Sequence, residues 1–261
     1  MLTYLQAGPE KPGAPTLFLL HAFPLSSEMW KPQLYALGRA GWRVIAPNVY
    51  GVEGSGEKPE WNFTDYAHEL ALLMDDLEIE KASIIGLSMG GYQAFEFYRH
   101  YPERAVSLVL CDTRAEGDTP QAREQRGEFM KGVETAGAEE AVRRMVPNFF
   151  SGEAYISKQE LPRETTEIIR RQSAEVINAA MRAIRERADS SPMLSSIRCP
   201  VLVMCGEEDR MTPPGTAEDI SVRIRGSRLV ILGGAGHISN MEQPDVFNRA
   251  LLEFLGAVHH S

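Results

Sequence analysis

A serine set between closely spaced glycines is the residue of this chain best placed for nucleophilic chemistry. The chain reads Gly86-Leu87-Ser88-Met89-Gly90-Gly91, directly after the apolar run ASIIGL and before a helical pattern. A G-x-S-x-G sequence between a strand and a helix forms a tight turn that exposes the serine hydroxyl. Glycine suits both outer positions, because a side chain there would collide across the turn. A glycine-rich turn with an incidental serine is the alternative, but the flanking patterns favour Ser88 as a nucleophile.

A serine hydroxyl becomes a good nucleophile only when a base takes its proton. Of the six histidines, only His237 lies in a glycine-rich loop, GGAGHISN, just after an apolar run. The others lie in helical patterns, at the end of an apolar run upstream of the serine, or in the C-terminal tail (His68, His100, His21, His259 and His260). A solvated loop is the alternative for His237, and we predict that it is the base.

The base in turn needs an acid that fixes its tautomer and stabilises the imidazolium. Asp209 ends the segment VLVMCGEED, and Glu207 and Glu208 compete with it on the same loop. Gly206 allows a turn that brings the third residue after it inward, which favours Asp209. An ordinary acidic surface turn is the alternative.

The oxyanion formed during acyl transfer needs two hydrogen-bond donors. Met89 N–H opens the helix after the serine, where the positive end of the helix stabilises negative charge. The loop His21-Ala22-Phe23-Pro24 follows the apolar run TLFLL, and Phe23 N–H is the expected second donor. Loss of one such donor typically raises the barrier by about 2.7–4 kcal/mol. The Phe23 ring is also expected to line the acyl pocket.

Short apolar runs alternate with helical patterns along the chain, which predicts an α/β fold. Such runs are typical of strands in a mostly parallel sheet with helices on both faces. A helical pattern begins near Phe63, another follows Ser88 and ends before Pro102, and a last one covers DVFNRALLEFLGAV. The predicted strands are Thr16–Leu20, Trp42–Pro47, Ala82–Leu87, Val106–Cys111, Val201–Cys205 and Arg228–Leu232.

Residues 114–191 interrupt this alternation with helical patterns alone. We expect residues 1–113 and 192–261 to form the α/β core and residues 114–191 to form a helical cap over the carboxyl ends of the strands, where open α/β sheets bind ligands. Arg114 either meets a substrate carboxylate or is a solvated loop residue, and we favour the second. The residues expected to line the pocket, or equally to pack on the core, are Met130, Met145, Val146, Phe149 and Phe150.

The composition is that of a globular protein, with 43% hydrophobic and 24% charged residues. The net charge of -9, without a long basic run, argues against binding to nucleic acid or to a membrane surface. Neither a secretory signal nor a membrane-length apolar run is visible. Cys111, Cys199 and Cys205 lack C-x-x-C spacing, which fits reduced thiols in a cytoplasmic protein. The oligomeric state is not indicated.

With these residues in place, the chain resembles the α/β-hydrolase superfamily over essentially its whole length. The matching pieces are HAFP, APNVYGVEGSG, GLSMGG, VLVMCGEEDRMTPP and GGAGHISNMEQP, in the superfamily's order of nucleophile, acid and base. GLSMGG followed by LVLCDTRAEGDTP is most similar to small bacterial carboxylesterases and to 3-oxoadipate enol-lactonase-like enzymes. His21-Ala22 replaces the usual His-Gly, and Asn48-Val49-Tyr50-Gly51 replaces the usual Asp-x-x-Gly.

The resemblance implies a serine hydrolase that cleaves small to medium carboxylic esters through an acyl-enzyme. No metal and no organic cofactor is expected, since the chain has no HExxH, P-loop or nucleotide-binding GxGxxG pattern. A lactonase of the 3-oxoadipate type, a cofactor-free perhydrolase and a ligand-binding protein without turnover are the alternatives. Ser88 in place of aspartate excludes haloalkane dehalogenase chemistry.

Overall fold

The computed structural model describes residues 1–11 and 13–259, which include a seven-stranded sheet in the order β1-β3-β2-β4-β5-β6-β7. His260, one of the tail histidines, lies outside these residues. All neighbouring strands are parallel except β1 and β3. The strands are β1 (Tyr4–Ala7), β2 (Thr16–Leu20), β3 (Arg43–Pro47), β4 (Ala82–Leu87), β5 (Ala105–Cys111), β6 (Val201–Gly206) and β7 (Arg228–Leu232).

The six predicted strands are confirmed, with three of their ends displaced by one residue. β3 begins at Arg43, β5 begins at Ala105 and β6 ends at Gly206. The sequence did not predict β1, a strand of four residues at the edge of the sheet that pairs with β3. Its partly exposed side chains give neither a continuous apolar run nor a clear alternation, so the usual strand signal is missing.

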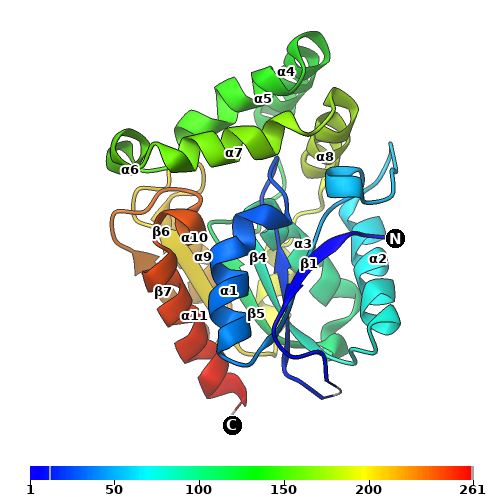
Figure 1. The fold of residues 1–261 in the computed structure, drawn as a ribbon, viewed down its shortest axis with the longest axis vertical. Helices are drawn as coiled ribbons and strands as arrows, with labels where there is room; N and C mark the ends of the chain where they lie inside the picture. Colours follow the sequence, from blue (N-terminus) through cyan, green and yellow to red (C-terminus); the bar gives the residue numbers. More distant parts are fainter. Residues whose placement is uncertain (12, 260–261) are drawn as a thin grey trace.

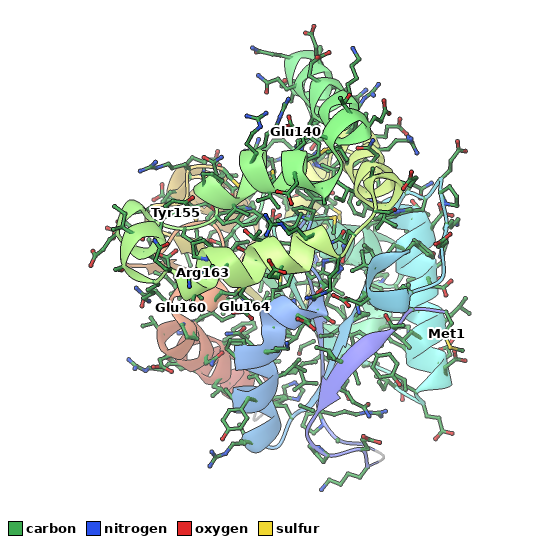
Figure 2. All side chains as sticks on the ribbon, turned by 45° about the horizontal axis from the view of Figure 1, so that its top comes forward. Met1, Glu140, Tyr155, Glu160, Arg163 and Glu164 are labelled. Atoms are coloured by element: carbon green, nitrogen blue, oxygen red, sulfur yellow. The ribbon has the colours of Figure 1, made fainter. Side chains whose placement is uncertain are left out.

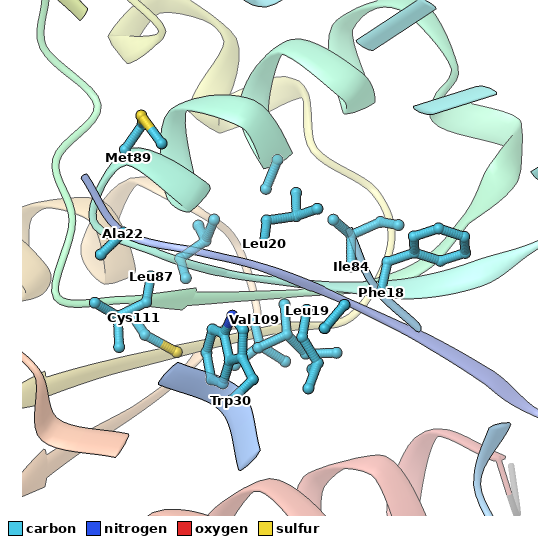
Figure 3. Close-up of a cluster of buried hydrophobic side chains, with 14 of the residues drawn as sticks. Phe18, Leu19, Leu20, Ala22, Trp30, Ile84, Leu87, Met89, Val109 and Cys111 are labelled. Atoms are coloured by element: carbon cyan, nitrogen blue, oxygen red, sulfur yellow. The ribbon is translucent and has the colours of Figure 1, made fainter. Parts of the chain in front are cut away.

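Helices cover both faces of the sheet. In Figure 3 the chain segment of Trp30 lies below the sheet and the helix that begins at Met89 lies above it. α1 packs against α11, and α2 packs against α3. An Asn62–Asp65 capping box starts α2. The core helices are α1 (Lys31–Arg39), α2 (Phe63–Asp76), α3 (Met89–His100), α9 (Pro214–Arg223), α10 (Ser239–Glu242) and α11 (Pro244–His259).

The central strands are buried on both faces, so their side chains form one apolar core. Every residue of β2 and β4 is buried. Figure 3 shows Phe18, Leu19 and Ile84 from these strands among the packed side chains. Burial of one such large side chain contributes about 1.5–3 kcal/mol. This packing makes the sheet a rigid base for the loops at its carboxyl edge.

Five helices between β5 and β6 lie above the sheet (Figure 1). We call them the cap helices. α7 shows why they pack there: Glu160, Arg163 and Glu164 are exposed (Figure 2), whereas Ile168 and Ile169 are buried. The cap helices are α4 (Pro120–Ala136), α5 (Ala138–Met145), α6 (Gly152–Ser157), α7 (Glu160–Arg170) and α8 (Ala174–Glu186).

Membrane insertion through a helix finds no support in the described part of the chain. None of its helices combines the length and the apolar character that crossing a bilayer requires.

Candidate active site

Ser88 occupies a sharp turn between β4 and α3. Its φ of 55° and ψ of −111° are unusual for a residue with a side chain. A Cβ on Gly86 would lie 2.1 Å from Gly90 O, and one on Gly90 would lie 2.0 Å from Leu20 O. Glycine is therefore required at both positions, as the sequence indicated. The turn presents Ser88 Oγ at the carboxyl edge of the sheet.

His237 connects the serine to a carboxylate. Its Nε2 lies 2.9 Å from Ser88 Oγ, and its Nδ1 lies 2.8 Å from Asp209 Oδ2. With Nδ1–H donating to the carboxylate, Nε2 is free to accept the serine proton. His237 and Asp209 are buried, so little water competes for these bonds. The structure thus brings together the three residues predicted as nucleophile, base and acid.

Asp209 is held as an anion by a dense set of donors. Its Oδ1 accepts from the N–H groups of Met211 and Thr212, and its Oδ2 accepts from Thr212 Oγ1 at 2.7 Å. Burial opposes ionisation, but His237 and these donors keep the pKa of Asp209 below its usual value. Glu207 and Glu208, the competing acids, are exposed.

Phe23 and Met89 were predicted to supply the two N–H donors for an oxyanion. Among the described residues, neither Phe23 N–H nor Met89 N–H donates to a protein acceptor. Met89 is the first residue of α3, and both residues line the cavity next to Ser88. A carbonyl oxygen bound there would find two unused donors and the positive end of a helix.

The cavity next to Ser88 has a volume of about 350 Å³ and walls from both the core and the cap helices. Of the five residues predicted to line it, Met145 does so, whereas Met130, Val146, Phe149 and Phe150 do not. Val146 and the two phenylalanines are buried instead, and the phenylalanine rings pack edge to face with centroids 6.3 Å apart. The apolar cap residues that do line the cavity are Ala122, Phe129, Met145, Met181 and Ile184.

Three arginines also line this cavity, and they differ in their partners. Arg126 pairs with Asp118, and Arg144 pairs with Glu140. Arg114 Nη2 donates at 2.8 Å to the main-chain oxygen of Met211, and within the described residues it has no carboxylate partner. Arg114 therefore lines the cavity, whereas the sequence favoured a solvated loop residue. A partly buried cation of this kind can bind an anionic group.

A buried glutamate that the sequence did not reveal connects the base loop to the cap. Glu242 is 1% exposed and accepts from Ser151 N–H at 3.1 Å and from Gly236 N–H at 2.9 Å. Ile238 N–H also donates to Phe149 O at 2.9 Å. The loop of His237 is thus joined to residues 149–151 on both sides, directly through Ile238 and by way of Glu242 through Gly236. A glutamate two residues before a proline carries no sequence signal for such a role.

One buried cluster has the residue types of a metal site. Donor atoms of Asp112, Cys205 and Asp209 lie within 4.8 Å of one another. Gly206 N–H donates to one oxygen of Asp112, and Ser239 Oγ is hydrogen-bonded to the other. Both oxygens of Asp209 also accept from protein donors. Hydrogen bonds therefore use the oxygens that a metal would need, and this donor set fits two hydrogen-bonded carboxyl groups better than a cation site.

Comparisons with known proteins agree with this geometry. The family model of the alpha/beta hydrolase fold matches residues 15–244. A thermophilic esterase from Thermogutta terrifontis, solved with malate bound, has a TM-score of 0.94 and 34% identity, and the match covers 99% of this chain and 94% of that chain. The 3-oxoadipate enol-lactonase 2 of Acinetobacter baylyi is 28% identical over 91% of this chain and 87% of its own length. The 2-hydroxy-6-oxo-6-phenylhexa-2,4-dienoate hydrolase of Comamonas testosteroni is 31% identical over 83% and 78%, respectively.

Proposed function

This chain belongs to the α/β-hydrolase fold family and is a hydrolase, and we propose that it is a serine carboxylesterase acting through an acyl-enzyme on Ser88. The observation that carries the proposal is the continuous hydrogen-bonded chain from Ser88 Oγ through His237 to Asp209, with contacts of 2.9 and 2.8 Å. The esterase from Thermogutta terrifontis, similar over nearly the whole chain, supports the reaction class.

In this proposal, His237 Nε2 takes the Ser88 proton as Oγ attacks the ester carbonyl. The resulting oxyanion binds the N–H groups of Phe23 and Met89, and Asp209 stabilises the imidazolium. His237 then protonates the leaving alcohol, which departs and leaves the acyl group on Ser88. Water then attacks the acyl-enzyme as His237 takes one of its protons, and His237 returns this proton to Ser88 Oγ as the acid is released.

We also propose that residues 114–191 act as the cap domain of a core formed by residues 1–113 and 192–261. The cavity next to Ser88 has walls from both parts, including Phe23 from the core and Phe129 from the cap helices. Its volume of about 350 Å³ is near the lower limit of ligand pockets, which supports small to medium acyl groups.

The first experiment compares wild type with Ser88→Ala on 4-nitrophenyl acetate, butyrate, octanoate and laurate. We expect turnover to fall by roughly 10⁶-fold in the variant, since the nucleophile is lost. The small cavity predicts higher kcat/KM for butyrate than for laurate. Equal, weak hydrolysis by both proteins would contradict the esterase proposal and favour a binding protein without turnover.

A second candidate function is a lactonase for substrates that carry a carboxylate. Arg114 supports it, because this guanidinium lines the cavity without a carboxylate partner among the described residues. The relative from Acinetobacter baylyi is a 3-oxoadipate enol-lactonase. The same triad would open a lactone ring, with Ser88 attacking the ring carbonyl and the leaving alcohol remaining attached to the acyl group.

The variant Arg114→Gln tests this candidate. A hydrogen bond to a charged group contributes about 1.5–3 kcal/mol, so we expect KM for a carboxylate-bearing enol-lactone to rise about 10- to 100-fold. KM for the neutral ester 4-nitrophenyl acetate should not change. Arg123→Gln is the matched control, because Arg123 is exposed on α4 and does not line the cavity. An equal effect on both substrates would exclude carboxylate recognition by Arg114.

A further inference from the structure

Asp112 lies directly after β5 and has no part in the proposed reaction, yet its environment is unusual. Asp112 is 1% exposed, and its φ of 46° lies in the left-handed region that favours glycine. Residues held in such a conformation cluster at active sites, where the surrounding structure fixes them. The Asp112 N–H donates to Met204 O of β6 at 2.9 Å. The turn is therefore fixed to the neighbouring strand.

The side chain of Asp112 connects the loops that carry the acid and the base. Gly206 N–H, three residues before Asp209, donates to Asp112 Oδ1 at 2.8 Å. A hydrogen bond of 2.5 Å joins Asp112 Oδ2 to Ser239 Oγ, two residues after His237. One carboxyl group thus holds both loops at once.

The two neighbours of Asp112 hold the nucleophile in the same way. Cys111 O accepts from Ser88 N–H at 2.9 Å, and Thr113 Oγ1 donates to Ser88 O at 2.8 Å. The segment 111–113 is consequently bonded to the nucleophile turn, the acid loop and the base loop. This segment belongs to LVLCDTRAEGDTP, which the sequence comparison singled out without giving it a role.

We propose that Asp112 is a positioning residue that fixes the acid loop and the base loop relative to each other and to Ser88. The inference rests on the proposed function, because it assumes that the Ser88–His237–Asp209 chain is the catalytic one. Asp112 itself touches none of the reacting atoms in this scheme, and it acts by holding Gly206 and Ser239 in place.

The charges around Asp112 suit a neutral carboxyl group. The titratable groups that interact with it are Asp209, Cys205, Cys111 and Glu242, and none of them carries a positive charge. Burial, and after it the Asp209 carboxylate, raise the pKa of Asp112 well above its usual value. A protonated Asp112 maintains both hydrogen bonds without a second negative charge beside Asp209. Asparagine has the same shape and no charge, so its side chain can form the same two hydrogen bonds, to Gly206 and to Ser239.

The test compares Asp112→Ala, Asp112→Asn and the control Ser107→Ala. Ser107 is buried on β5, the strand that precedes Asp112, and donates to Ser83 Oγ at 2.8 Å, so its variant loses one buried hydrogen bond away from the triad. The measurements are kcat and KM for 4-nitrophenyl acetate, the pH profile of kcat/KM, and the far-downfield proton resonance of His237 Nδ1–H. Thermal melting by circular dichroism reports whether each variant is folded.

We expect Asp112→Ala to lower kcat by about 10- to 100-fold at unchanged KM, since a small misplacement of catalytic groups has effects of this size. The downfield resonance should disappear in this folded variant. Asp112→Asn should retain the resonance, most of kcat and the wild-type pH profile, and Ser107→Ala should match wild type. If Asp112→Ala does not fold, Ser239→Ala, which removes only one of the two bonds, should show a smaller loss of kcat and a broadened resonance.

Wild-type kcat and resonance in folded Asp112→Ala, or in Ser239→Ala if the first does not fold, would overturn the proposal. So would an equal loss in Asp112→Asn and Asp112→Ala, because the charge and not the hydrogen bonds would then matter. Failure of the proposed function is distinguishable, since it would appear as absent turnover in wild type. The resonance of His237 would still report on Asp112 in that case.

Discussion

His21 is a buried polar residue whose contacts require one protonation state. Its Nδ1 lies 2.9 Å from Ala22 O, and its Nε2 accepts from Val49 N–H at 3.1 Å. The ring must therefore donate from Nδ1 and accept at Nε2, which only the neutral tautomer can do. The bond to Val49 ties the loop of Phe23 to the loop after β3. This contact holds the two loops together, although the sequence of each loop departs from the usual pattern of the family.

Burial, partly offset by the bond to Ala22 O, lowers the pKa of His21 from 6.5 to about 4. Between these values the unfolded chain binds a proton that the folded chain does not, so stability falls as the pH falls. From pH 7 to pH 5 this linkage lowers the free energy of unfolding by about 2 kcal/mol, because each pH unit below 6.5 contributes about 1.36 kcal/mol. Urea unfolding of wild type and His21→Asn at both pH values measures it.

Between pH 7 and pH 5 the free energy of unfolding should fall by about 2 kcal/mol less in His21→Asn than in wild type. This difference does not depend on the stability of the variant at pH 7. His68→Asn is the control, because His68 is exposed on α2. A pH dependence that is the same in wild type and His21→Asn would show that His21 does not carry this linkage.

Residues were predictable from the sequence where backbone geometry and reaction chemistry jointly restrict them. Ser88 needed glycines at fixed spacing, and His237 and Asp209 each followed an apolar run, so all three fell on one sheet edge. Asp112 and Glu242 had no such signal. Their roles depend on loops that meet only in three dimensions, as the contacts to Ser239 and Ser151 show.

At the scale of elements, the strands were easier to predict than the faces of the helices. Strands buried on both sides are nearly all apolar, whereas β1, at the edge of the sheet, is not. The cap helices were predicted as helices, but periodicity does not tell which apolar residue faces the cavity. Phe129 lines the cavity and its neighbour Met130 does not, because consecutive residues on a helix point about 100° apart.

The short helix α10 shows how an element without sequence signal organises the site. Its four residues include Ser239, bonded to Asp112, and Glu242, bonded to the segment before α6. α10 thus connects the core, through Asp112, to the segment before α6, through Ser151. Lys158, which follows α6, adds a bond of 2.7 Å to Glu242 O. The position of the base therefore depends on both parts of the protein.

At the scale of the whole molecule, the cap helices and the core share one apolar interior. Phe149, Ile168 and Ile177 of the insertion belong to the same buried cluster as the strands. Polar contacts add to it, for example Gln172 Nε2, which donates to Pro24 O at 2.6 Å. Parts that share a continuous interior lose their packing together, whereas domains with small polar interfaces unfold independently.

We therefore expect the cap helices and the core to unfold in one transition in urea. The three tryptophans, Trp30, Trp42 and Trp61, are buried in the core and none lies in a cap helix, so their fluorescence reports on the core. Far-UV circular dichroism is weighted toward helices and includes the cap helices. The two signals should have the same midpoint.

The variant Ile168→Ala makes this test sharper, because Ile168 lies in α7 and is 1% exposed. Removing a buried isoleucine side chain typically costs about 2–5 kcal/mol. In a single cooperative unit, this loss in the cap lowers the midpoint of tryptophan fluorescence in the core as much as that of circular dichroism. The control Ile156→Ala, at a residue that is 75% exposed on α6, should move neither midpoint. A shift confined to circular dichroism would mean that the cap opens while the core stays folded, so that the cavity walls could separate without unfolding of the triad.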